Sequence, residues 1–202
     1  MNKKFEVNVN ELLSILKMLF SSPLKAWSFV LERDYPWRDL LIYLTIPLFF
    51  FSSFAGIFSD MPEFNQIKLP PNWIFLVIFL GSIIAIFLSS WMISAMAPRF
   101  TGERSFDKTF ALISLSYTPV LFGSIISSIH QVLQFINFVA LVYMIFLFWR
   151  GAAILLRIPS IKQTGFALVS LLILFASRVV ISAFLASVAL FLTGNVDDFL
   201  NQ

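Results

Sequence analysis

The stretch LPPNWIFLVIFLGSIIAIFLSSWMISAMAP, residues 69–98, contains no Asp, Glu, Lys, Arg or His. A helix that crosses the hydrocarbon core of a bilayer needs about 20 mainly apolar residues. The stretch is long enough for one crossing even when its Pro-Pro entry is left out. It therefore predicts a membrane-spanning helix over about residues 73–97.

Uncharged runs of similar length lie on both sides of this stretch. Residues 40–59 carry no charge, and residues 109–149 carry none apart from a neutral His130. The second run is too long for one crossing, and the polar residues near its middle predict a tight turn between two helices. The last run is interrupted by one charge, Arg178. The fold class is therefore predicted as all-α, a polytopic membrane bundle of five helices with spans of about 40–58, 73–97, 110–129, 135–156 and 166–192.

The composition supports a membrane protein and excludes several function classes. Only 12% of the 202 residues are charged and 59% are hydrophobic, whereas a soluble domain carries about 25% charged residues. With no cysteine and one histidine, the chain offers no set of ligands for a zinc or copper site, and we predict no cofactor. No span contains an acidic residue or a nucleophile paired with a base, which predicts a protein that is not an enzyme. The basic residues flank apolar runs and form no dense tract, which argues against nucleic acid as a partner.

Lysine and arginine are distributed unevenly between the two sides of the predicted bundle. The loops after the second and fourth spans carry a basic face made of Arg99, Arg104, Lys108, Arg157 and Lys162. The opposite loop and the C-terminal tail carry one lysine, Lys68, with Asp60, Glu63, Asp197 and Asp198. The positive-inside rule then predicts a multi-pass protein of the cell (inner) membrane, with its N-terminus in the cytoplasm and its C-terminus outside.

Residues 1–37 form a cytoplasmic segment before the five-span domain, residues 38–202. Apolar side chains recur at helical spacing over residues 9–20, and again after Pro23, which predicts two short amphipathic helices. They could lie in the membrane interface and dock a partner there. The other interpretation, which we favour, is that they cover the cytoplasmic end of their own bundle.

Arg178 lies near the middle of the last span, where an arginine costs at least about 2.5–3.5 kcal/mol. It could contact an anion, a lipid headgroup or a substrate in a wet cavity. It could instead bind carbonyls that a helix break sets free, or extend its long side chain toward the membrane interface. Pro47 and Pro119 are expected to kink their helices. If the fifth span is interrupted, the interruption is expected at Arg178. The candidate intramembrane polar site consists of Arg178, Tyr117, Ser116, Thr118 and Pro119.

Small residues recur at four-residue spacing in two spans. Gly81, Ala85 and Ser89 lie in the second, and Ala183 and Ser187 lie in the fifth. Such stripes let helices approach closely. They predict a compact bundle, a homo-oligomer, or both.

Three stretches together resemble a known family. They are LFSSPLKAW at 19–27, APRFTGERSFDKTFALISLSYTPVLFG at 97–123, and YMIFLFWRGAAILLRIPSIK at 143–162. In this order they are similar to the prokaryotic branch of the Yip (Ypt-interacting protein) membrane family. The resemblance implies a five-span bundle with a cytoplasmic N-terminus. Eukaryotic relatives bind Rab-type GTPases and one another in vesicle traffic, and their Asp-Leu-Tyr-Gly-Pro motif is absent from this chain.

Two functions follow from these features. The first is a non-enzymatic membrane protein that organises lipids or membrane partners, with the lipid bilayer and a homo-oligomer or other membrane proteins as its partners. The alternative is a small transporter or channel, with a site for an anion, a lipid headgroup or a solute near Arg178 and the Pro119 break.

Overall fold

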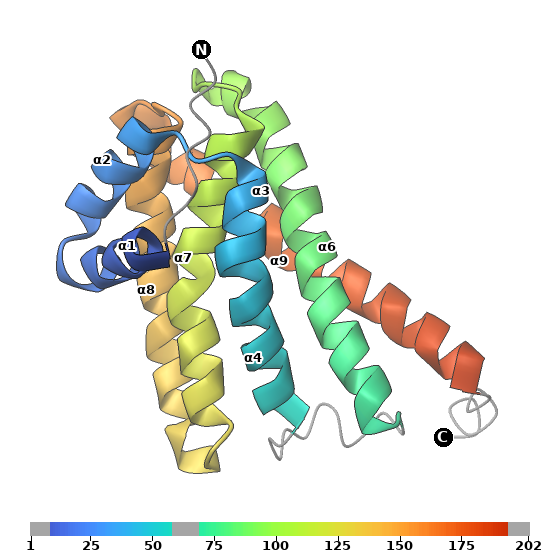
Figure 1. Cartoon of the computed structure of the whole chain (residues 1–202). Helices are drawn as coiled ribbons and strands as arrows, with labels where there is room; N and C mark the ends of the chain where they lie inside the picture. The colour runs from blue at the N-terminus through green and yellow to red at the C-terminus, as the bar shows by residue number, and fades with distance from the viewer. Residues whose placement is uncertain (1–8, 58–68, 194–202) are drawn as a thin grey trace.

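A computed structural model describes residues 9–57 and 69–193, and this part of the chain is helical with no strand. The acidic loop and tail used to predict the orientation lie outside it. Five helical segments in the described part are long and apolar enough to cross a membrane (Figure 1). They run over Trp37–Ile57, Pro71–Phe100, Phe106–Ser127, Gln134–Leu155 and Ser160–Thr193. The all-α fold class with five candidate spans is therefore confirmed.

The third candidate span, α7 (Phe106–Ser127), lies at the centre of the bundle. It packs against α4 (Ile46–Ile57), α6 (Pro71–Met96) and α8 (Gln134–Leu155). In an apolar stretch of 18 residues within α7, about 72% is buried inside the protein. The corresponding share is 39% or less in each of the other four candidate spans. Helix α7 is also the least apolar of the five. Its neighbours thus cover its hydroxyl groups from the lipid, while the more apolar helices face outward.

Neither of the two intramembrane prolines ends its helix. The first span consists of α3 (Trp37–Leu40), a π-helical turn η1 (Leu41–Thr45) and α4. Because the ring of Pro47 crowds the preceding turn and lacks an N–H donor, the wider π turn accommodates it. Thr45 also donates its hydroxyl to the Leu40 carbonyl at 3.0 Å. The expected break at Pro119 is wrong, because α7 is helical on both sides of this residue.

The fifth span is one helix, α9 (Ser160–Thr193), and it is not broken at Arg178. Its C-terminal half leans away from α7 and α8 but stays packed along α6 (Figure 1). A Cβ at Gly81 of α6 would lie 3.4 Å from the Ser182 hydroxyl of α9. This is the close approach that the small-residue stripes predict.

The N-terminal helices α1 (Val9–Ser21) and α2 (Pro23–Arg33) form a hairpin on the side of the bundle (Figure 1). An ion pair of 2.8 Å between Arg33 Nε and Glu11 Oε1 joins their open ends. Their apolar faces contribute Leu12, Ile15, Leu19, Ala26, Trp27 and Val30 to the main core. Of the two interpretations, packing on the bundle is the one observed. The hairpin lies on the flank of α8, from Gly151 near its C-terminal end to Tyr143 near its middle.

Candidate functional site

Arg178 and Tyr117 come together between α9 and α7. Arg178 Nη1 donates a hydrogen bond of 3.3 Å to the Tyr117 hydroxyl. The guanidinium carbon also lies 5.8 Å from the centroid of the tyrosine ring. A guanidinium has five N–H donors, and within residues 9–57 and 69–193 the structure gives Arg178 no ion pair with a carboxylate. Most of its donors are therefore open to water, lipid or an anion.

A cavity of about 10 Å³ has Arg178 and Tyr117 in its lining. Its lining consists of Phe49, Ser82, Ala85, Ile86, Ser89, Tyr117, Leu174 and Arg178. Ser89 is fully buried, and its hydroxyl has no hydrogen-bond partner in the described part of the chain. The volume is at the lower limit for one water molecule, and the lining is mostly apolar. The hydrogen-bond partner of Arg178 is the Tyr117 hydroxyl, and the structure gives the guanidinium no carbonyl partner within residues 9–57 and 69–193.

The other predicted members of the polar site lie elsewhere. Thr118 donates its hydroxyl to the Ser114 carbonyl of its own helix at 3.3 Å. The Ser116 hydroxyl is buried without a partner among the described residues, and neither Ser116 nor Pro119 lines the cavity. Sequence reasoning missed Ser82 and Ser89 as site residues. Their only signal was the small-residue stripe of the second span, which we interpreted as a packing surface.

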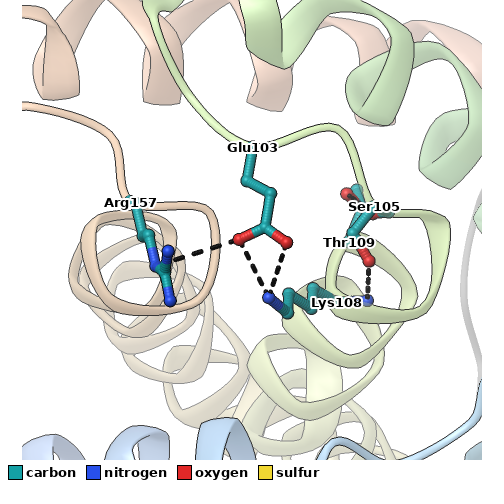
Figure 2. A network of polar contacts seen from close by, with 5 residues as sticks. All are labelled: Glu103, Ser105, Lys108, Thr109 and Arg157. Carbon is teal, nitrogen blue, oxygen red and sulfur yellow. Dashed lines mark hydrogen bonds and ion pairs between the residues drawn. The ribbon is translucent and has the colours of Figure 1, made fainter.

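The predicted basic face is partly neutralised by an acidic residue, as Figure 2 shows. Lys108 Nζ lies 2.8 and 2.9 Å from the two carboxylate oxygens of Glu103, and Arg157 Nε lies 3.8 Å from Oε2. The Glu103 backbone N–H also donates to the Leu156 carbonyl at 2.8 Å. We call Glu103, Lys108 and Arg157 the loop clasp, because they join the α6–α7 loop to the α8–α9 loop. The remaining residues of the face, Arg99, Arg104 and Lys162, are exposed.

Local backbone structure holds the loop clasp in place. Ser105 caps α7 by accepting a hydrogen bond of 3.3 Å from the Lys108 N–H, and the Thr109 hydroxyl donates to the Ser105 carbonyl at 2.7 Å (Figure 2). Gly102 leaves the loop no room for a side chain, because a Cβ there would overlap the Ile158 side chain. The cap and the glycine together direct Glu103 toward Lys108.

Replacing Glu103 with glutamine is expected to weaken the loop clasp slightly. The hydrogen bond from Lys108 lowers the pKa of the Glu103 carboxyl. The stabilisation is therefore complete above the unfolded-state value of about 4.3 and is lost as the pH falls through the lower folded-state value. Melting temperatures in detergent should show a small deficit for Glu103→Gln at neutral pH, and the deficit should vanish in acid. Glu32→Gln, at an exposed position of α2, is the control. An equal deficit at all pH values would contradict the ionic role.

A comparison with known protein families finds a match over most of the chain. The family model of the Yip1 domain matches residues 17–181. The chain belongs to the Yip1 domain family. No curated protein and no solved structure matches it. The Yip1 match runs from α1 to just beyond Arg178, so it includes most of the hairpin, the loop clasp and the Arg178–Tyr117 pair. The resemblance to the Yip family is thereby confirmed, while the assignment to its prokaryotic branch stays a prediction.

Proposed function

We propose that this Yip1-family protein is not an enzyme and that it organises membrane partners, with a second copy docking on the C-terminal half of α9. The observation that carries the proposal is that this half-helix leaves α7 and α8 and keeps only α6 as its neighbour among the described helices. Only about 22% of the most apolar window of α9 is buried, the smallest share among the five candidate spans. After Ser177, Ala189 is the one buried residue of α9, so the half-helix presents a long exposed surface.

The exposed surface of this half-helix has the chemistry of a helix–helix contact. Ser182 faces Gly81 of α6, whereas Ala183 and Ser187 are exposed. The Ser187 hydroxyl donates to the Ala183 carbonyl at 2.9 Å, so it needs no further partner. Two small side chains four residues apart allow a second helix to approach closely. Exposed Phe184 and Phe191 would give such a helix large contact surfaces.

Cysteine cross-linking tests the second copy directly, because the chain contains no cysteine. Under mild oxidation in native membranes, Ala183→Cys is expected to form a covalent dimer in high yield. Ile84→Cys, at an exposed position in the middle of α6, should give little dimer. Adding Ser187→Leu to Ala183→Cys should reduce the dimer several-fold, because the larger side chain separates the helices. Equal yields at positions 183 and 84 would contradict the proposal.

A transporter receives less support from the same structure. Its candidate site at Arg178 adjoins a cavity of about 10 Å³, which has room for about one water molecule. An anion or a lipid headgroup would need a larger opening between α9 and α7. A transporter is therefore the second candidate function, after the organisation of membrane partners.

A further inference from the structure

The tip of the α1–α2 hairpin contacts the middle of a membrane-spanning helix. Tyr143, near the centre of α8, donates its hydroxyl to the Leu19 carbonyl at 2.6 Å. The Phe20 ring stacks on Tyr143 at 5.9 Å and meets Phe122 of α7 edge-on at 6.5 Å. These contacts place the C-terminal end of α1 beside Tyr143 along the length of α8.

The depth of this contact follows from helix geometry. At 1.5 Å per residue, Tyr143 lies about 18 Å below the end of α8 at Leu155. Trp149 and Arg150 are typical of the membrane interface, and Arg150 lies over the Trp149 ring at 5.3 Å. Tyr143 is about 9 Å below Trp149 on the same helix. Half of a hydrocarbon core is about 15 Å thick. The tip of the hairpin therefore lies within one leaflet, well below the headgroups.

The exposed side chains near the tip of the hairpin are of types that are stable within the hydrocarbon of a leaflet. Leu13, Phe20 and Leu24 are 50%, 52% and 50% exposed. Lys17 and Lys25 are exposed beside them, and long lysine side chains can extend toward the headgroups while their stems stay in lipid. The charged pair of Glu11 and Arg33 lies at the opposite, open end of the hairpin.

We infer that α1 and α2 form a re-entrant hairpin immersed in the leaflet on the side of the loop clasp. The partner of its outward surface is the phospholipid of that leaflet, with acyl chains against Leu13, Phe20 and Leu24 and headgroups near Lys17 and Lys25. This goes beyond the dimer contact proposed above, because the hairpin and the C-terminal half of α9 are different surfaces. One can be wrong without the other.

Spin labels on single cysteines measure the depth, again because the natural chain has no cysteine. The protein is labelled at Phe20→Cys or Leu24→Cys and reconstituted in vesicles of phosphatidylcholine and phosphatidylglycerol. Collision rates are measured with oxygen, which concentrates in the hydrocarbon, and with a water-soluble nickel complex. Ile84→Cys, exposed in the middle of α6 and away from the proposed dimer contact, is the lipid reference, and Glu32→Cys on α2 is the water reference.

We expect both tip labels to favour oxygen over nickel several-fold, as the label at Ile84 should. The inference is overturned if both tip labels resemble the label at Glu32, which would place the hairpin in water. It is also overturned if both are shielded from oxygen and nickel alike, which would mean that a protein partner or a second copy covers the tip. Two independent tip positions guard against one substitution that disturbs the fold.

Discussion

Replacing Trp27 with alanine is expected to lower the free energy of unfolding by about 3–5 kcal/mol. The Trp27 side chain is fully buried in the main core, where α2 meets α7 and α8. Its indole N–H has no hydrogen-bond partner among the described residues. The loss is therefore one of packing, and the cavity left by the ring cannot be filled by rigid neighbours.

Denaturant titration in detergent micelles, followed by circular dichroism, measures this effect. Trp91→Ala is the matched control, because Trp91 lies on α6 with 60% of its surface exposed. The control should change the unfolding free energy by less than about 1 kcal/mol, since few protein contacts are lost. Similar losses for both variants would mean that the hairpin is not packed on the bundle as described.

The number of spans could be predicted because hydrophobic length alone determines it. Residues 69–98 carry no charge, and a helix is the simplest structure that satisfies every backbone group of such a run in lipid. The depth of the hairpin could not be predicted. The pattern of Leu12, Ile15 and Leu19 shows which face of α1 is buried, but the same face could pack at the end of α8 or on its flank. Only the contact with Tyr143 decides between these positions.

The candidate site was predicted in part, for reasons that lie in helix geometry. Arg178 and Tyr117 both lie near the middle of their helices, so they could be matched by depth. Adjacent residues on a helix point about 100° apart, which is why Ser116 and Thr118 do not share the environment of Tyr117. A charged side chain also does not interrupt the backbone hydrogen bonds of its own helix. Arg178 is therefore accommodated by its neighbours, without a break in α9.

Replacing Gly151 with valine is expected to destabilise the protein by about 3 kcal/mol, at the upper end of the usual cost of overpacking. A Cβ at this buried position of α8 would lie 2.5 Å from Leu112 Cδ1 and 2.8 Å from Trp27 Cε2. The leucine methyl can move, but the buried indole is rigid and cannot. The change should therefore push α2 away from α8. Gly165→Val is the matched control on α9, where the nearest atom, Phe100 Cε1, would lie 3.6 Å from a Cβ.

A double-mutant cycle in the same denaturant titration separates the indole contact from a general effect on α8. In a Trp27→Ala background, the cavity left by the indole can accept the valine side chain. Gly151→Val should then cost at least about 1 kcal/mol less than it does in the natural chain, because side chains in direct contact show interaction energies of about 0.5–3 kcal/mol. Additive losses would show that Gly151 is needed for a reason other than Trp27. The spin label at position 24 gives an independent readout, because a displaced α2 should become more accessible to the nickel complex in Gly151→Val and unchanged in Gly165→Val.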